Sequence, residues 1–223
     1  MQCASCGAQN PDGKKFCGEC GAPLRPVAPV AELRQITVMF CDLVGSTALA
    51  ERLDPEDLRE VTGAYHDVCS AVIARHEGHI AQYLGDGLLV YFGYPKAHED
   101  DPRRAVRAGL EILRGMDALN VRLARERKLE LAVRIGIHTG PVVVGEVGAG
   151  ERREHLAMGR TPNLAARLQG VAEPGTMVVS GDTQGITRGF FEFASLGARD
   201  LKGVADEIPL FRVIGRASCR ERV

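Results

Sequence analysis

The sequence predicts an α+β domain of the split βαβ, or ferredoxin-like, type, in which an antiparallel-rich sheet carries helices on one face. From residue 34 onward, hydrophobic patterns typical of strands and helices alternate in the order β-α-β-β-α-β, with further elements after them. Four of the seven cysteines lie in the first 20 residues, which sets that segment apart. The 223 residues, 45% hydrophobic and 26% charged, suffice for one globular domain of about 150 to 200 residues and a small appendage.

The composition excludes several classes of function. The 28 Lys and Arg nearly balance the 29 Asp and Glu, and a net charge of -1 gives no overall field toward nucleic acid or anionic lipid. Lys14, Lys15 and Arg25 are too few for a nucleic-acid patch. No apolar run approaches the roughly 20 residues that span a bilayer, and the N-terminus lacks a signal-peptide pattern. We expect a cytoplasmic protein with no membrane segment and no nucleic-acid partner.

The N-terminal cysteines have the spacing of a metal site. Cys3, Cys6, Cys17 and Cys20 form two Cys-x2-Cys pairs, and each pair is followed by glycine. Four thiolates in this pattern converge on one tetrahedral Zn2+, in a closed site without an open position for substrate. The alternative, two disulfides or free thiols, is disfavoured in a reducing cytosol. A folding or docking role is therefore favoured over catalysis.

The chain is expected to divide into four parts. We expect a zinc ribbon over 1–21, a proline-rich linker over 22–33, the main domain over 34–214 and a tail over 215–223, which is either native or a truncation. The chain itself is either whole or a fragment of a longer multidomain protein.

The first half of the main domain has clear signals. Residues 36–43, ITVMFCDL, form an apolar, β-branched run typical of a buried strand. Asp54-Pro55 and the acids after it begin a helix over about 55–77, whose apolar positions recur every three or four residues. Residues 79–84 and 88–92 flank Gly85-Asp86-Gly87, which predicts a hairpin with Asp86 in its turn.

The second half continues the alternation. Apolar residues from Val106 to Leu123 predict a long helix, and two strands follow at 131–139 and 141–147. Thr161-Pro162 begins another helix. Short strands are expected around the following segments: 177–179, 190–193 and 209–213.

Two carboxylates are the first candidates for chemistry. Asp42 ends an apolar strand and Asp86 interrupts a hairpin, positions at which a carboxylate is costly unless it is paired or binds a cation. If the strands are neighbours, the two oxygens can converge to hold Mg2+ or Mn2+. The alternative for each residue alone is a turn-capping Asp. After Asp42 the chain runs through Leu43, Val44, Gly45, Ser46 and Thr47 into a short helical stretch, where backbone N–H groups could receive phosphate oxygens.

The helix that begins at Thr161 has a polar face. Asn163 lies in its first turn and Arg167 one turn later on the same side, while Leu164, Leu168 and Val171 form the apolar stripe. An amide that orients a sugar and a guanidinium that neutralises a phosphoryl group are plausible roles. The alternative is a solvated surface Asn and Arg.

Together these segments resemble the catalytic domain of class III nucleotidyl cyclases. The resemblance rests on FCDLVGST with Asp42, YLGDGLLVYFG with Asp86, VRIGIHTGPVVVGEVG with Arg134, GRTPNLAARL with Asn163 and Arg167, and LKG with Lys202. Order and spacing agree over about residues 34 to 214.

The resemblance implies an activity and a site. In such cyclases Asp42 and Asp86 would hold two divalent ions, Mg2+ or Mn2+, and Asn163 and Arg167 would stabilise the transition state from the opposite protomer. Arg134, Lys202 and the loop 43–47 would contact the polyphosphate. ATP would become 3′,5′-cyclic AMP and pyrophosphate in intracellular signalling. The chain carries the metal-binding pair, Asp42 and Asp86, once, and the pair supplied by the opposite protomer, Asn163 and Arg167, once. The resemblance therefore implies a head-to-tail homodimer.

The sequence departs from the family where the base is selected. Gln82 stands where adenylyl cyclases usually carry Lys, and Leu156 where they carry Asp or Thr. Leu156 cannot hydrogen-bond an adenine amino group, whereas Gln82 could donate or accept. ATP remains the favoured substrate over GTP. One alternative is a weak or inactive pseudocyclase, a nucleotide-binding and dimerisation module that regulates an attached effector. Another makes the zinc ribbon a protein-docking element with the cyclase as its cargo.

Overall fold

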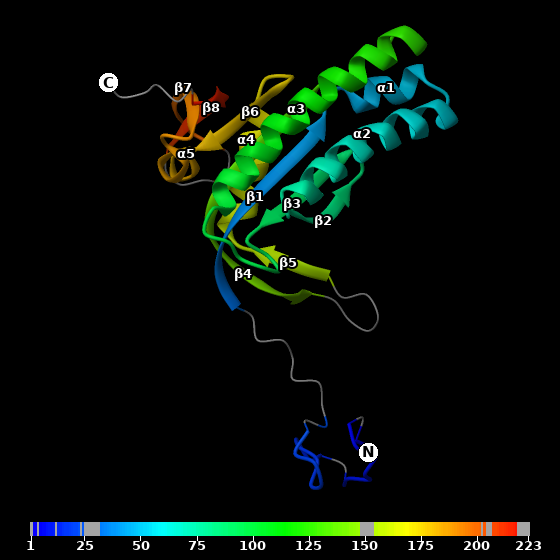
Figure 1. The fold of residues 1–223 in the computed structure, drawn as a ribbon, viewed down its shortest axis with the longest axis vertical. Coiled ribbons are helices and arrows are strands. Elements are labelled where there is room, and N and C mark those ends of the chain that lie inside the picture. Colours follow the sequence, from blue (N-terminus) through cyan, green and yellow to red (C-terminus); the bar gives the residue numbers. More distant parts are fainter. Residues whose placement is uncertain are drawn as a thin grey trace.

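The main domain is built on one mixed sheet. The computed structural model describes residues 2–3, 5–11, 13–22, 24, 32–147, 154–201, 203 and 207–217. Within the described residues the sheet has eight strands: seven run in the order β2-β3-β1-β4-β6-β8-β7, and the eighth, β5, pairs with β4 beside this path. All neighbouring strands are antiparallel except β4 and β6 (Figure 1). The strands are β1 (Glu32–Leu43), β2 (His79–Leu84), β3 (Gly87–Phe92), β4 (Val133–Val147), β5 (Glu154–Met158), β6 (Thr176–Ser180), β7 (Phe191–Arg199) and β8 (Ile208–Arg216).

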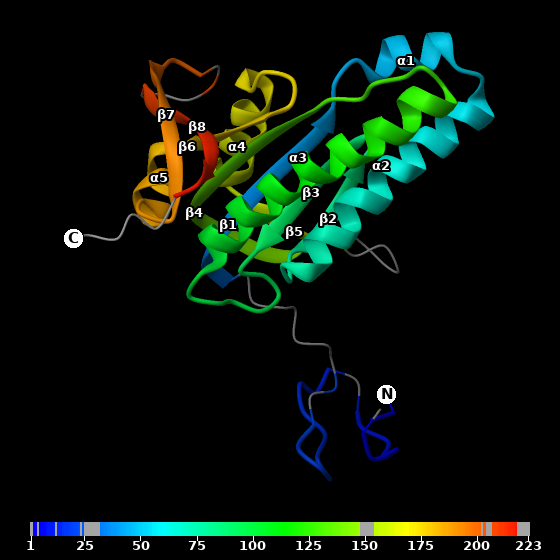
Figure 2. The same ribbon diagram turned by 45° about the horizontal axis from the view of Figure 1, so that its top comes forward.

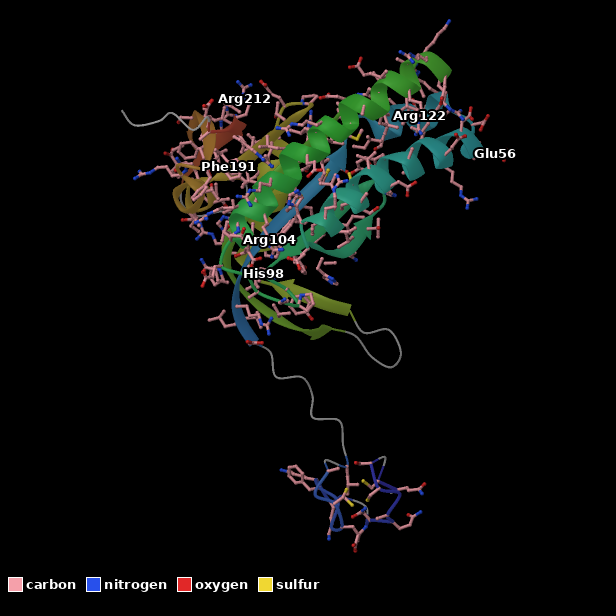
Figure 3. All side chains as sticks on the ribbon, in the orientation of Figure 1. Glu56, His98, Arg104, Arg122, Phe191 and Arg212 are labelled. Atoms are coloured by element: carbon pink, nitrogen blue, oxygen red, sulfur yellow. The ribbon has the colours of Figure 1, made fainter. Side chains whose placement is uncertain are left out.

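Two long helices cover one face of this sheet. α2 (Pro55–Arg75) begins at Asp54, whose side chain accepts from the backbone N–H groups of Glu56 and Asp57. α3 (Asp101–Glu126) lies beside α2 (Figure 2). The buried core lies between these helices and the inward side chains of β1, β3 and β4. Because α2 and α3 are antiparallel, Glu56 and Arg122 lie at one end of the pair, and His98 and Arg104 lie at the other (Figure 3).

The third main helix covers the opposite face. α4 (Arg160–Val171) packs its buried Leu164, Ala165 and Leu168 against residues of the sheet that point away from α2 and α3. The ferredoxin-like α+β fold is thus confirmed, but the expectation of helices on one face holds only for α2 and α3. The correction has a steric cause: Gly136 of β4 lacks the side chain that would keep α4 from the sheet.

The predicted elements are present with shifted limits. The strands expected at 131–139 and 141–147 are one strand, β4, which continues through Gly140-Pro141. Pro141 falls in the gap between the segment paired with β6 and the segment paired with β5, where a missing backbone donor is tolerated. β1 begins at Glu32 rather than 36. The sequence patterns did not indicate β5 or the short helix α5 (Gly181–Thr187), whereas α1 (Ser46–Arg52) was expected as a helical stretch. Within the described residues, no helix combines the length and apolarity that crossing a bilayer requires.

Candidate active site

The topology brings the two aspartates together. β1 and β3 are neighbours, and Asp42 at the end of β1 lies beside the tight turn Gly85-Asp86 that joins β2 to β3. Gly87 allows this approach, because a Cβ placed there would lie only 3.1 Å from Oδ1 of Asp42. Gly85 adopts φ 68°, a left-handed conformation that glycine tolerates best, and so permits the turn.

Burial and the repulsion between the two carboxylates favour a bound cation at this position. Burial and then the negative charge of Asp86 raise the pKa of Asp42, and a backbone donor and the charge of Arg134 only partly oppose them. Oδ2 of Asp86 is buried and has no hydrogen-bond partner within the described part of the chain. Two facing carboxylates with an unused buried oxygen fit a divalent cation, which prefers oxygen ligands and would remove their repulsion.

Arg134 stands next to this pair. It is the direct register partner of Asp42 across β1 and β4, and its buried Nε makes no hydrogen bond to any described residue. The guanidinium can therefore offer donors to an anion beside the carboxylates. Gln82 is half-buried on β2, opposite Leu89 of β3 and next to a β-bulge, four residues before Asp86.

The loop from Leu43 to Thr47 follows Asp42 directly. The Val44 backbone N–H donates to the Ala132 carbonyl at 2.8 Å, which anchors the loop on the segment before β4. Gly45 has φ 71° and precedes α1, and no side chain caps that helix. The first backbone N–H groups of α1 are therefore not capped by the side chain of the preceding residue.

Asn163 and Arg167 lie on the side of α4 that is turned away from the sheet. Both are exposed, and Asn163 Nδ2 donates to the Gly159 carbonyl at 3.4 Å. On an ideal helix they point roughly 110° to 150° away from the direction of the buried stripe. The structure therefore does not bring them to Asp42 and Asp86 within one protomer.

The position of α4 along the sheet also separates them. Thr161 Oγ1 donates to the Pro141 carbonyl at 2.8 Å, which places the start of α4 beside the middle of β4. From Arg134 to Pro141 the strand spans about 23 Å at the usual rise per residue. Asn163, in the first turn of α4, is therefore far from the carboxylates.

One residue near the carboxylates was missed by sequence reasoning. Gln169, near the end of α4, donates from Nε2 to Oδ2 of Asp42 at 3.3 Å. The helical pattern does place Gln169 beside the buried stripe that contains Ala165 and Leu168, but a polar residue there gives no sign of its partner 127 residues away.

Two predicted site residues are not placed. Leu156 lies on β5 with its backbone opposite Gly145, and its side chain is outside the described part of the structure. Lys202 lies outside the described residues altogether. Their expected contacts stay predictions.

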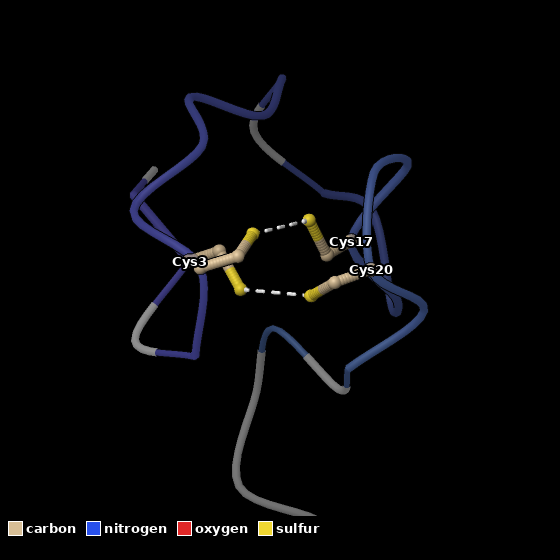
Figure 4. Close-up of side chains that lie close together, drawn as sticks. Cys3, Cys17 and Cys20 are labelled. Atoms are coloured by element: carbon tan, nitrogen blue, oxygen red, sulfur yellow. Dashed lines mark hydrogen bonds between the residues drawn. The ribbon is translucent and has the colours of Figure 1, made fainter.

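The four N-terminal cysteines form a second site (Figure 4). The four Sγ atoms all lie within 4.8 Å of one another. The Sγ–Sγ distances are 3.7 Å for Cys3–Cys20 and 3.6 Å for Cys6–Cys17. Gly7 and Gly21, with φ of 74° and 71°, donate back to the Cys3 and Cys17 carbonyls at 2.8 and 3.0 Å, so each pair forms a tight knuckle.

Backbone N–H groups near the cysteines favour the ionised thiolate, which is the form that binds a metal. The N–H groups of Cys20 and Glu19 lower the pKa of Cys17 to about 6. Cys6 receives a similar contribution from Ala8, but the neighbouring Cys20, burial and the other thiols outweigh it and raise the pKa of Cys6 to about 12. Four thiols so close cannot all ionise without a cation, and the donor set fits Zn2+.

A cavity of about 700 Å³ lies elsewhere in the domain, at the start of α4. His138 lines it, is 6% exposed, and its Nδ1 is hydrogen-bonded with Ser180 Oγ at 2.7 Å. Burial lowers the pKa of His138 to about 4, so the ring is neutral at pH 7. Asp42 and Asp86 do not line this cavity, so it is separate from the site of the two carboxylates.

Comparison with known proteins gives the family. Residues 29–215 match the family described as the adenylate and guanylate cyclase catalytic domain, and residues 2–24 match the zinc-ribbon domain family. Adenylate cyclase 1 of Rhizobium meliloti (strain 1021) is 34% identical over 184 residues, 82% of this chain and 28% of that protein. Retinal guanylyl cyclase 1 of Homo sapiens is 27% identical over 200 residues, 88% of this chain and 17% of that protein. The chain thus spans less than a third of these relatives.

Solved structures agree with this assignment. The crystal structure of the adenylyl cyclase CyaB from P. aeruginosa matches with a TM-score of 0.81 and 28% identity, over 85% of this chain and 97% of that one. The guanylyl cyclase Cya2 matches with a TM-score of 0.81 and 31% identity, over 86% and 97%. Because similar proteins of both kinds occur, the likeness identifies the catalytic-domain family and leaves the purine open.

Proposed function

The chain belongs to the adenylate and guanylate cyclase catalytic-domain family, and on this premise we propose that it converts ATP to 3′,5′-cyclic AMP and pyrophosphate in a signalling role. The observation that carries the proposal is the meeting of Asp42 and Asp86, which leaves a buried oxygen of Asp86 unpartnered, among the described residues, beside a carboxylate of raised pKa. Purely structural aspartates would be expected to find protein donors.

The residues of this chain have distinct tasks in that reaction, in which the ribose 3′-oxygen attacks the α-phosphorus and pyrophosphate leaves. Asp42 and Asp86 would hold two Mg2+ or Mn2+ ions, which in this family lower the pKa of the 3′-hydroxyl and neutralise the leaving group. Arg134, next to Asp42, would bind the polyphosphate, together with Lys202 and backbone donors of the loop 43–47.

A second copy of the chain would complete the site. Arg167 would balance the charge that develops on the transferring phosphoryl group, and Asn163 would orient the ribose. Both face solvent in one protomer, on the side of α4 turned away from the carboxylates. A head-to-tail homodimer supplies them from the partner and forms two equivalent sites.

Base selection would rest on Gln82 and Leu156. The half-buried Gln82 lies four residues before Asp86 and can offer a donor or an acceptor to a purine edge. Leu156 offers neither, so discrimination between ATP and GTP is expected to be modest. Gln82→Lys combined with Leu156→Asp should raise the ratio of kcat/KM for ATP over GTP. An unchanged ratio would show that these positions do not select the base.

The zinc ribbon is proposed to be a separate, structural part. Its four sulfur atoms would close the coordination of one Zn2+, with no position for substrate. Its proposed function is to dock a protein partner.

The direct test is product formation. The purified protein is incubated with ATP or GTP and Mn2+, and cyclic product is measured beside Asp42→Ala, Asn163→Ala and a Gln184→Leu control. We expect product from the parent and the control, and a loss of about 100-fold or more in both site variants. No product from the parent under any condition would exclude catalysis.

Complementation tests the dimer. Asp42→Ala and Asn163→Ala are each inactive as homodimers, but a mixed dimer keeps one intact site, with metal ligands from one protomer and Asn163 from the other. If subunits exchange freely, an equal mixture should recover about one quarter of the parent activity. Recovery of none would contradict the shared site.

A second candidate is a nucleotide-binding pseudocyclase that regulates an attached effector. The apolar Leu156 at the base position favours it, because it removes one contact that would orient the substrate. This candidate predicts nucleotide binding and dimerisation without cyclic product. The same assay therefore separates the two.

A further inference from the structure

The contact of Gln169 with Asp42 joins two elements with different tasks. Asp42 lies at the end of β1 and Gln169 near the end of α4, and the amide Nε2 donates to Oδ2 of the carboxylate at 3.3 Å. The bond occupies Oδ2, so the Asp42 carboxylate is held in one orientation. Oδ1 is the oxygen next to Gly87, on the side of the turn that carries Asp86.

The backbone at Gln169 is held tightly against the sheet. A Cβ on Gly136 would lie 2.1 Å from the Gln169 nitrogen, 2.4 Å from the Ala165 oxygen and 2.8 Å from the Gln169 Cα. α4 therefore rests directly on the backbone of β4, two residues from Arg134. Because this contact is backbone against backbone, it fixes the root of the Gln169 side chain.

The same helix carries the two groups that the proposed dimer would present to the other protomer. Asn163 and Arg167 lie on its exposed side, and Gln169 lies on the side of Asp42. A helix of 12 residues moves as one body. A shift of α4 at Asp42 would therefore also move Asn163 and Arg167.

We propose that Gln169 is a positioning residue, which orients Asp42 for the divalent ions and fastens α4 to the metal site of its own protomer. The inference rests on the proposed function, since it gives Asp42 the role of metal ligand. Residues that hydrogen-bond to a ligand orient it, and their loss weakens metal binding by about 10- to 100-fold.

Metal binding without turnover tests the first half. Mn2+ binding is measured by the electron paramagnetic resonance of free Mn2+, for the full chain, Gln169→Leu, Gln169→Met and the control Gln184→Leu. Gln184 is a matched control because it is half-buried like Gln169 but lies on α5, outside the proposed metal site. The ribbon is loaded with Zn2+ beforehand, and Asp42→Ala defines the signal of the proposed site. We expect about 10-fold or greater weakening in both Gln169 variants and none in the control.

The possible results separate the two proposals. If the parent binds no more Mn2+ than Asp42→Ala, the proposed metal site fails. If the parent binds Mn2+ and the two Gln169 variants, folded by circular dichroism, bind it equally well, the role of Gln169 fails alone. Gln169→Met keeps the length of the side chain, so a loss in both variants reports the missing donor rather than a cavity.

Hydrogen exchange tests the second half. Mn2+ should slow the exchange of the α4 backbone amides in the parent and in Gln184→Leu, because the ions hold Asp42 and Asp42 holds Gln169. In Gln169→Leu at saturating Mn2+, this protection of α4 should disappear while that of the Gly85-Asp86 turn remains. Equal protection of α4 in parent and variant, or none in the parent, would overturn the link.

Discussion

The two candidate metal sites of this chain are built in opposite ways. The four sulfur atoms of the ribbon lie within 4.8 Å of one another in a segment with little buried surface, and Cys6 and Cys20 are exposed. Asp42 and Asp86 lie on a sheet whose position is already set by a continuous hydrophobic core. The difference predicts that a metal would be needed to fold the first site, whereas at the second site a metal would bind a domain that is already folded.

Removing the ribbon's metal should have the largest effect. Cys17→Ser, or a strong chelator, should unfold residues 2–24, because structural Zn2+ contributes about 10 kcal/mol or more to such a segment. The main domain should keep its unfolding temperature, since its core contains none of these residues. Zinc content and NMR dispersion report the ribbon, and calorimetry reports the domain. Loss of both together would contradict the separation.

The stability of the main domain should depend on packing rather than on a bound metal. Gly136→Ala would place a methyl group against backbone atoms of α4, the closest at 2.1 Å, so the helix must move. We expect a loss of roughly 1–3 kcal/mol in the free energy of unfolding and weaker Mn2+ binding, measured by denaturant titration and titration with Mn2+.

The matched control is the same substitution on α4 where space is free. A Cβ on Gly170 meets no atom within 4 Å, so Gly170→Ala should stabilise the helix by up to about 1 kcal/mol. Equal stability of Gly136→Ala and the parent would show that α4 is not seated on this glycine.

The contrast between a local site and a site built by packing also explains which features could be predicted from the sequence. The four-cysteine site is local, and spacing alone indicated it. The sequence predicted that Asp42 and Asp86 meet only on the condition that their strands are adjacent, and the pairing of β1 with β3 meets that condition. The contact of Gln169 with Asp42 depends on the face to which α4 packs, which is decided by the space above Gly136 and not by any pattern within the helix. β4 was divided in two because Gly140-Pro141 usually ends a strand, and only the gap between its partners β5 and β6 allows it to continue.

Removing one of the two carboxylates should change the stability of the main domain in a direction that depends on divalent ions. Without divalent ions, Asp86→Asn should raise the stability of the main domain, because it removes a negative charge beside Asp42. The gain should be about 1 kcal/mol or less, since both side chains are partly exposed to solvent. Calorimetry in chelator measures it. In excess Mn2+ the parent should be more stable than Asp86→Asn, because the variant binds the ion less well. A variant that is less stable under both conditions would show that Asp86 has a structural role.

The smallest effect concerns pH. Folding raises the pKa of Asp42 above its usual 3.8, so the folded state holds this proton more tightly than the unfolded chain. The stabilisation is complete below about 3.8 and is lost as the pH rises through the raised value.

His138 also titrates at acid pH, with the opposite effect on stability, and must be separated from Asp42. Burial lowers its pKa from 6.5 to about 4, so the domain loses stability as the pH falls and the unfolded chain takes up the proton. Both parent and Asp42→Asn carry His138, and their difference in the free energy of unfolding isolates Asp42. In chelator, the parent should become less stable relative to Asp42→Asn as the pH rises from about 4. With Mn2+ the trend should reverse, because the ion binds the ionised carboxylate. A difference independent of pH in chelator would show that folding does not raise the pKa of Asp42, and would remove the electrostatic reason for a cation at this site.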